Sequence, residues 1–396
     1  MGYHRGLDLL RFNFFLTIRK LNSGVSLLTG ALVLGLTTLS VQSLGETILN
    51  TLFNQTTIEL IASVILIASF GFIYEEIGKL NEMTKNLEKI VSDNRMITMA
   101  VPALFGMLPM YGGALLSAPV VNAEGEKLKM APTRRTFVNL WFRHVSHFIY
   151  PLSSTIILAA YLSGMSVLSL ALSGLPASIA AITVGYVIGL RKVEVNKQKA
   201  IMSNEALKNV MISVAPILVA IVVAVATGIK TYVSIAIGLL ILIAIARSSL
   251  KMMYSAARKA ISRIVLPTLA AVIFGNIIYA AKLPETVSNL TKGTSIHWIV
   301  LAIAIPLALG VFVGNITASI AISIPLLAGM TTLNPISVSL ITVSALLSYI
   351  VSPLHLCFIL TNAYFKTRTT DVYRLLIPTA LITMAATALI DTYFIL

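Results

Sequence analysis

Long apolar segments separated by short polar ones dominate the chain. A helix that crosses a bilayer needs about 20 apolar residues. Nine segments qualify as spans: 25–44, 57–74, 132–163, 166–190, 207–228, 231–247, 264–281, 335–365 and 373–395. Two further apolar stretches, 96–122 and 297–329, carry Pro and Gly in their middles. Such residues weaken a helix interior, and irregular backbone at membrane depth must be buried in protein or line a wet cavity. We therefore predict an all-α membrane protein with nine spans and two re-entrant hairpins.

Prolines also interrupt two of the predicted spans. Pro151 breaks the span 132–163, and Pro353 breaks the span 335–365. Each break would free backbone carbonyls close to a hairpin tip, and it carries hydroxyl or imidazole side chains that could join them. The candidate side chains around the two breaks are Ser153, Ser154 and Thr155 in the first, and Ser352 and His355 in the second. We predict two discontinuous helices that form a cradle for an ion or a solute.

The chain contains an internal repeat. Segments 79–89 and 282–292 share six of eleven residues, and the register persists to Pro102 and Pro306 and to the prolines of the two broken spans. An odd number of spans precedes the second copy, so the copies are predicted to be inverted, as in many secondary transporters. We predict an interfacial helix over 1–24, a first repeat over 25–228 and a second over 229–396.

The charge distribution sets the expected orientation. The chain is 57% hydrophobic and 11% charged, with a net charge of +14. Lys and Arg gather in segments 75–95, 123–135, 191–208, 247–263 and 366–374. If the stretches 96–122 and 297–329 each enter and leave the membrane on the same side, all five basic segments lie on one side of the membrane. The positive-inside rule identifies that side as the cytoplasm. We expect a plasma-membrane protein with a cytoplasmic N-terminus and an external C-terminus, in contact with the lipid bilayer and not with nucleic acid.

The hairpin tips are the first candidate binding elements. A helix N-terminus there would offer backbone amides to an anion, and free carbonyls would suit Na⁺. Small residues could equally serve only close helix packing, and for Ser319 and Ser323 the two interpretations are balanced. The candidate residues are Pro109, Gly112, Gly113 and Ser117 in the first hairpin, and Gly314, Asn315, Thr317 and Ser319 in the second.

Ionisable residues inside a span are costly and indicate function by default. Arg143 could bind an anionic solute, extend to the membrane interface, or pair with carbonyls of the hairpin. His144 and His147 share a helix face, but this spacing alone is weak support for zinc, and a structural hydrogen bond is the commoner role. Proton coupling by His147 or His355 is an alternative. A single cysteine, Cys357, argues against a disulfide and a cysteine-based metal site, so we expect no metal and no cofactor beyond a coupling ion.

These patterns favour a secondary active transporter of a small anionic solute, coupled to Na⁺ or H⁺, over two alternatives. The first is an ion or metabolite channel, and the second is an intramembrane enzyme that uses Ser and His or the paired histidines. The middles of the spans carry no carboxylate for a proton relay, and the chain has no phosphate-binding GxxxxGK[ST] motif for an ATP motor.

Two motifs resemble a known family. Asn139-Leu-Trp-Phe-Arg-His144, followed by Tyr150-Pro151-Leu152, resembles the NYWFRH…WPLYPG signature of the domain-of-unknown-function 401 family, and GMLPMYGGALLSAPVV (106–121) resembles its GxLPMPGGAxxSAP block. The resemblance implies membership of the ion-transporter superfamily, whose divalent-anion/sodium symporters have inverted repeats and two hairpins and work as elevator-type homodimers. It adds Asn139 to the candidate site. His147 stands where the family commonly has a carboxylate, which leaves the coupling ion open.

Overall fold

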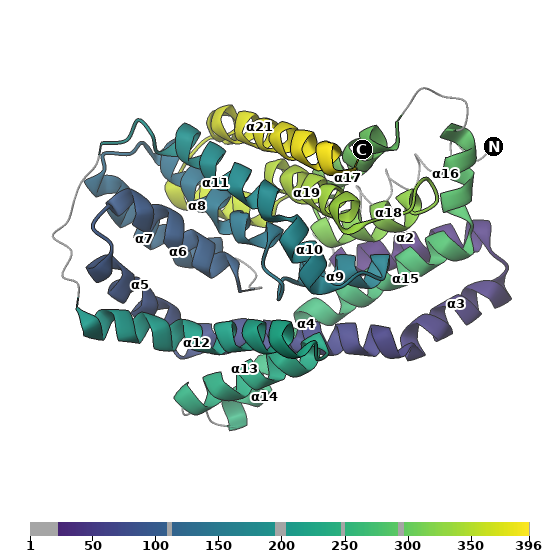
Figure 1. The fold of residues 1–396 in the computed structure, drawn as a ribbon, viewed down its shortest axis with the longest axis horizontal. Helices are drawn as coiled ribbons and strands as arrows, with labels where there is room; N and C mark the ends of the chain where they lie inside the picture. The colour runs from purple at the N-terminus through teal and green to yellow at the C-terminus, as the bar shows by residue number, and fades with distance from the viewer. Residues whose placement is uncertain (1–22, 109–112, 195–202, 247–249, 292–296, 396) are drawn as a thin grey trace.

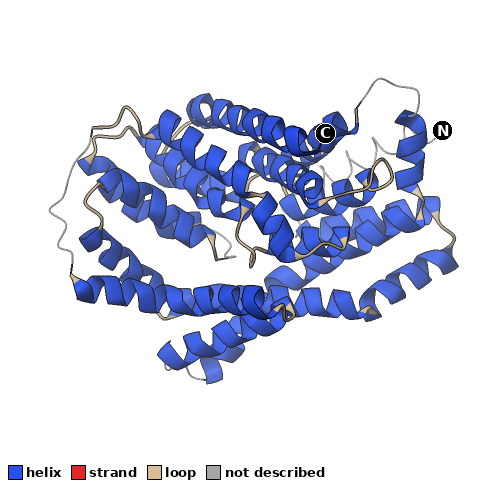
Figure 2. Cartoon of the chain, viewed as in Figure 1, coloured by secondary structure: helices blue, strands red, loops and turns tan. Residues whose placement is uncertain are grey.

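The structure is a computed structural model that describes residues 23–108, 113–194, 203–246, 250–291 and 297–395. Every regular element in these ranges is helical (Figure 2). The predicted interfacial helix 1–24 lies almost wholly outside the described residues, as do Pro109 and Gly112 of the first hairpin tip.

The first part of the chain, up to residue 189, forms ten α-helices and a short 3₁₀ helix among the described residues. They are α2 (Ser23–Thr38), α3 (Val41–Phe53), α4 (Gln55–Glu76), α5 (Lys79–Ile90), α6 (Asn94–Gly106), α7 (Ala114–Lys127), α8 (Pro132–Val145), η1 (Ser146–Phe148), α9 (Ser154–Ser163), α10 (Val167–Ser173) and α11 (Leu175–Gly189).

The rest of the described chain is helical in the same way, with one short π-helical turn. Its elements are α12 (Asn204–Thr227), α13 (Thr231–Ala246), α14 (Leu250–Ala260), η2 (Ile261–Val265), α15 (Leu266–Ala280), α16 (Leu283–Thr291), α17 (Trp298–Val313), α18 (Ile316–Leu327), α19 (Pro335–Val351), α20 (Leu356–Phe365) and α21 (Thr369–Ile395).

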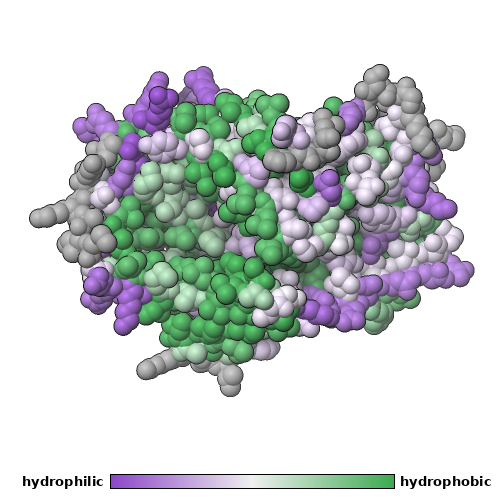
Figure 3. Space-filling view, in the orientation of Figure 1, coloured by the Kyte–Doolittle hydropathy of each residue, from purple (hydrophilic) through white to green (hydrophobic). Residues whose placement is uncertain are grey.

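The described chain contains six helical segments that are long and apolar enough to cross a membrane. They are Gln55–Glu76, Val167–Gly189, Asn204–Thr227, Lys251–Ala280, Pro335–Phe365 and Thr369–Tyr393. The protein is therefore a multi-pass membrane protein. On the face seen in Figure 3, hydrophilic residues gather mainly at the two sides of the view, and a broad apolar area lies between them over α12 and α13. Val222 and Val225 are among the exposed apolar side chains of α12.

The other three predicted spans form shorter or interrupted helices. The predicted span 25–44 contains a helix boundary, because α2 ends at Thr38 and Ser40 caps α3 by accepting a hydrogen bond from the amide of Ser43. α13 has 16 residues, and the span 132–163 is divided between α8 and α9. A capping serine marks the point at which a new helix begins. Hydrophobicity alone therefore predicted one continuous helix where the chain forms two.

The chain turns back on itself at both predicted hairpins. α6 packs against α7, and α17 packs against α18 (Figure 1). Both outgoing and incoming arms contain an internal proline, and the described tip of the second hairpin uses Gly314 with φ of +61°. A left-handed residue at the end of α17 ends that helix, as glycine commonly does.

Each hairpin packs closely on one broken helix. A β-carbon added at Gly106 of α6 would lie 2.9 Å from the carbonyl carbon of Arg143 and closer still to its oxygen. A β-carbon added at Gly310 of α17 would lie 2.9 Å from Cβ of Ser348 in α19 and closer still to its hydroxyl. Glycine is required at position 106 because the backbones of α6 and α8 approach with no side chain between them, and at position 310 because it leaves room for the side chain of Ser348.

The order of elements recurs along the chain. The corresponding helices begin at Asn94 (α6) and Trp298 (α17), at Pro132 (α8) and Pro335 (α19), and at Ser154 (α9) and Leu356 (α20). The separation within each pair is nearly constant, and it matches the offset between the repeated segments 79–89 and 282–292. Each hairpin is thus followed by a broken helix at the spacing of the sequence repeat.

Candidate functional site

The first broken helix carries its polar residues around the break. α8 ends at Val145, and one turn of 3₁₀ helix leads to Tyr150 and Pro151. Ser153 then caps α9, because its hydroxyl accepts a hydrogen bond of 3.3 Å from the amide of Thr155. Ser153 and Thr155 are buried and Ser154 is half-buried. The hydroxyl of Ser153 is therefore already used by the backbone.

Arg143 is a buried cation next to the first hairpin tip. Its side chain extends from α8 and is only 4% exposed. A β-carbon at Gly113, the residue that precedes α7, would lie 2.8 Å from Cζ of Arg143 and closer still to Nη2. Among the residues that the structure describes, Nη1 of Arg143 has no hydrogen-bond partner. A buried guanidinium group with a free donor needs a negatively charged or carbonyl partner.

Ser117 and Asn139 join this hairpin to α8. Both side chains are fully buried. The hydroxyl of Ser117 donates a 2.7 Å hydrogen bond to Oδ1 of Asn139, whose Nδ2 donates to the carbonyl of Ala114 at 2.9 Å. These two predicted site residues satisfy each other and the first turn of α7, so they hold the hairpin against the helix that carries Arg143.

Three histidines gather where the two broken helices meet. The ring of His144 lies 5.5 Å from that of His147 and 4.9 Å from that of His355, measured between ring centroids. The ring of Tyr349 lies 4.0 Å from that of His355. His144 is 3% exposed and His355 is completely buried. The two halves of the chain thus contribute imidazoles to one buried cluster.

The second hairpin tip is more exposed than the first broken helix. Asn315 caps α18 by accepting a 3.1 Å hydrogen bond from the amide of Ala318, and Gly314, Asn315 and Thr317 are all half-buried. Ser352, at the break after α19, is buried and donates a 2.8 Å hydrogen bond to the carbonyl of Val311 in α17. This tip therefore lies against the second break.

Ser319 serves the backbone of its own hairpin. It is buried and donates a 2.9 Å hydrogen bond to the carbonyl of Pro306, which also accepts one from Ser348 of α19. The hydroxyl of Ser323 is buried without a partner among the described residues. The hydroxyl of Ser319 thus takes part in helix packing, whereas that of Ser323 does not, and a binding role for either serine stays a prediction.

The structure brings the predicted residues into two groups. One contains Gly113, Ser117, Asn139 and Arg143 with His147 close by, and the other contains Gly314, Asn315, Ser319 and Ser352. His355 links them through His144. Sequence reasoning missed Cys357 and Tyr349 as neighbours of the histidines. The only signal for them is their position around the second break, because nothing local indicates which residues of the other half they face.

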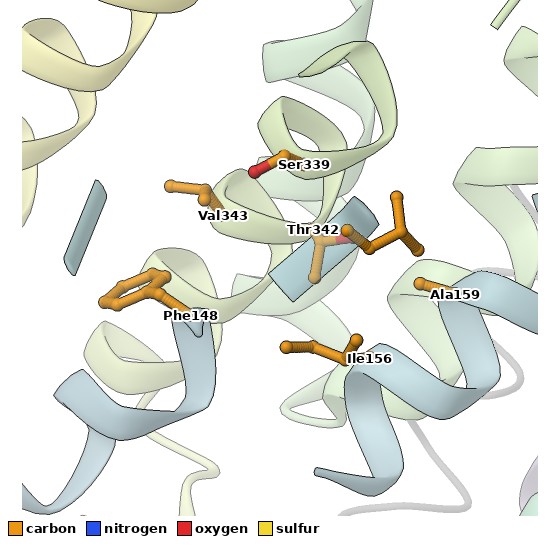
Figure 4. A pocket seen from close by; sticks show the side chains of 7 residues that line it. Phe148, Ile156, Ala159, Ser339, Thr342 and Val343 are labelled. Carbon is orange, nitrogen blue, oxygen red and sulfur yellow. The ribbon is translucent and has the colours of Figure 1, made fainter. Parts of the chain in front are cut away.

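A small cavity lies beside the site (Figure 4). Its walls are Phe148, Ile156, Ala159, Leu170, Ser339, Thr342 and Val343, from η1, α9, α10 and α19. Its volume is about 10 Å³, which is room for a single water at most. The lining is largely apolar and holds no charged residue, so the cavity does not by itself bind an anion.

Comparison with known proteins identifies the family. Residues 12–394 match the family model described as protein of unknown function (DUF401). The chain belongs to the DUF401 family. This confirms the resemblance carried by the two motifs. Among curated proteins, none matches the sequence.

The fold of this DUF401 protein is similar to a solved structure. That structure is the YdaH transporter of Alcanivorax borkumensis, whose crystal structure is described as having an unusual topology. The TM-score is 0.70 at 10% sequence identity, over 97% of this chain and 98% of the other. At this identity the likeness establishes a shared fold across the whole chain.

Proposed function

We propose that this protein is a secondary active transporter of a small anionic solute, and that Arg143 binds the negative group of that solute. The observation that carries the proposal is the buried guanidinium of Arg143, which lies against Gly113 with Nη1 unpartnered among the described residues. A buried charge without a partner is expensive. A bound anion would remove that cost whenever the site is occupied.

The surroundings of Arg143 favour an anion over a cation. None of the ion pairs among the described residues includes Arg143. α7 begins at Ala114, directly after Gly113, and the N-terminus of a helix adds partial positive charge and free backbone amides. A carboxylate or similar group would receive charge-assisted hydrogen bonds from the guanidinium and would lie next to the helix terminus.

The fold supports transport. It is shared along nearly its whole length with a chain described as a transporter, and hairpins next to broken helices are the usual place for solute sites in secondary transporters. We further propose inverted repeats, two opposed re-entrant hairpins, an elevator-type movement, a homodimer and coupling to Na⁺ or H⁺. In this proposal the protein lies in the plasma membrane with its N-terminus in the cytoplasm and its C-terminus outside. The recurring order of hairpin and broken helix supports the repeats.

The first experiment identifies the solute class and tests Arg143 together. Purified protein is screened for thermal stabilisation by mono- and dicarboxylates, phosphate and sulfate, with and without Na⁺ and across pH. A ligand that binds the folded state stabilises it in proportion to the logarithm of its concentration over its Kd. The stabilising anion is then tested for uptake into proteoliposomes with an imposed Na⁺ or H⁺ gradient.

The variants separate a specific role of Arg143 from its charge. Arg143→Gln is expected to abolish anion-dependent stabilisation, and Arg143→Lys to weaken it, because a lysine lacks the planar fork of donors. Arg191→Gln removes the same charge at an exposed position at the end of α11 and is the matched control. Unchanged anion binding in Arg143→Gln would overturn the assignment. Flux that persists after all ion gradients have collapsed, at rates above those of a carrier, would indicate a channel instead.

A further inference from the structure

We propose that His144, His355 and Cys357 form a binding site for a transition-metal ion, with Zn²⁺ as the ion that the ligand set fits. One ligand atom from each of the three side chains lies within 4.8 Å of the other two. His144 comes from α8 in the first half, and His355 and Cys357 come from the second break and the first turn of α20. Two imidazoles and one thiol are ligands that zinc takes in proteins.

The hydrogen bonds of the two histidines leave one nitrogen of each ring available. Nδ1 of His144 lies 2.7 Å from the carbonyl oxygen of Leu140, and Nδ1 of His355 lies 3.3 Å from that of Ile350. A carbonyl oxygen only accepts, so both Nδ1 atoms donate and both Nε2 atoms keep a lone pair. Imidazoles that bind metals nearly always donate their other N–H in this way, which fixes the ring and its tautomer.

The second observation is the unpartnered ring nitrogen of His355. Its side chain is fully buried, and its Nε2 has no hydrogen-bond partner among the described residues. A buried acceptor without a donor is costly, and a metal ion bound at Nε2 would remove that cost. The same side chain belongs to the cluster that includes the sulfur of Cys357, which is 9% exposed.

Only small side-chain movements would complete the site. Zinc lies about 2.0–2.1 Å from nitrogen and about 2.3 Å from sulfur, so tetrahedral ligand atoms are roughly 3.3–3.8 Å apart. The 4.8 Å limit of the present cluster is about 1 Å wider, which rotation about the side-chain torsions covers. Three protein ligands leave a fourth position open, and His147 is the nearest further imidazole to His144 among the described residues.

Charge constrains the state in which the metal binds. Arg143 precedes His144 and opposes a nearby cation, so the thiol of Cys357 must bind as the thiolate. Binding then releases one proton from the thiol for each zinc ion bound, and the thiolate offsets one of the two positive charges of the ion. The metal site does not depend on the proposed transport, because its ligands are distinct from Arg143.

Cys357 is the only cysteine in the chain, which gives the site its own spectroscopic signal. Tag-free, full-length protein is stripped with a chelator, and Zn²⁺ binding is measured by calorimetry and by metal analysis after dialysis. Co²⁺ is then added as a spectroscopic substitute for zinc. We expect one Zn²⁺ per chain and a thiolate-to-cobalt charge-transfer band that Zn²⁺ abolishes.

Two variants and a control test the ligands. Cys357→Ser is expected to remove the cobalt band, and His355→Asn to weaken Zn²⁺ binding by more than about 100-fold, since loss of even a supporting residue around a metal costs 10- to 100-fold. His297→Asn is the matched control. His297 caps α17, a helix that contributes none of the three proposed ligands, and asparagine also caps well. Its zinc affinity should equal that of the unmodified protein.

A measurement on the unmodified protein tests the proposal even if the variants do not fold. Zn²⁺ should slow alkylation of Cys357 by a small thiol reagent at least tenfold, and chelator should restore the rate. Binding of less than a stoichiometric amount of zinc, a cobalt spectrum without a thiolate band, or alkylation that zinc does not change would each overturn the proposal.

Discussion

Gly113→Ala tests whether the hairpin positions the guanidinium of Arg143. The added β-carbon would lie 2.8 Å from Cζ of Arg143, whereas an ordinary van der Waals contact begins at 3.4 Å. The neighbouring atoms belong to the far end of a flexible side chain, and the closest of them is Nη2. The guanidinium therefore shifts by about 1 Å and the fold is retained. We therefore expect a change in ligand binding and little change in stability of the free protein.

The expected magnitude follows from the hydrogen bonds that the shift disturbs. A hydrogen bond to a charged group contributes about 1.5–3 kcal/mol, so losing one weakens anion binding about 10- to 150-fold. A ligand at 100 times its Kd stabilises the unmodified protein by about 2.7 kcal/mol. At the same ligand concentration the variant should gain only about 0.3–1.4 kcal/mol.

The assay is the thermal shift given by the most stabilising anion of the screen. Gly45→Ala is the control, because a β-carbon at Gly45 in α3 has no neighbouring atom within 4 Å, and its anion-dependent shift should match the unmodified protein. If Gly113→Ala binds the anion within twofold of the unmodified protein, the guanidinium does not contact the solute in the geometry described here.

Two further substitutions test the packing of the first hairpin. Gly106→Ala should lower the unfolding free energy by about 1–3 kcal/mol, because its β-carbon would overlap the backbone of Arg143 and backbone cannot rotate away; a thermal midpoint equal to that of the unmodified protein would contradict this. Asn139→Ala should cost about 2 kcal/mol and Ser117→Ala about 1 kcal/mol, because Asn139 loses bonds to both Ser117 and the carbonyl of Ala114. The double variant should cost less than the sum, and strict additivity of the three midpoints would argue against a shared network.

The sequence predicted the elements of this fold well where Pro, Gly or a capping residue marks the end of a helix. The stretches 96–122 and 297–329 turn back as α6–α7 and α17–α18. In the second stretch, Gly314 ends α17 and Asn315 caps α18. Both proline breaks lie between helices, at Pro151 and at Pro353. The positions of the hairpins relative to the membrane, and the inversion of the repeat, stay predictions.

The sequence predicted the site less completely, because contacts between distant residues leave no local pattern. Three roles were open for Arg143, and its position against Gly113 is a contact that no local pattern indicates. Cys357 and His144 come from opposite halves of the chain, and periodicity tells which face of a helix each occupies without telling which residue it meets. A single cysteine argued against a cysteine-based metal site, yet it lies beside two imidazoles.

The glycine contact between α6 and α8 has a mechanical consequence. Gly106 rests on the carbonyl of Arg143 with no side chain between the two backbones, so the contact has no flexible part that could stretch or tilt. We therefore expect α6 and α8 to move together at this contact. A hairpin that swung open as a hinged gate would have to break this contact first. We therefore expect any rearrangement that moves Arg143 to carry α6 with it.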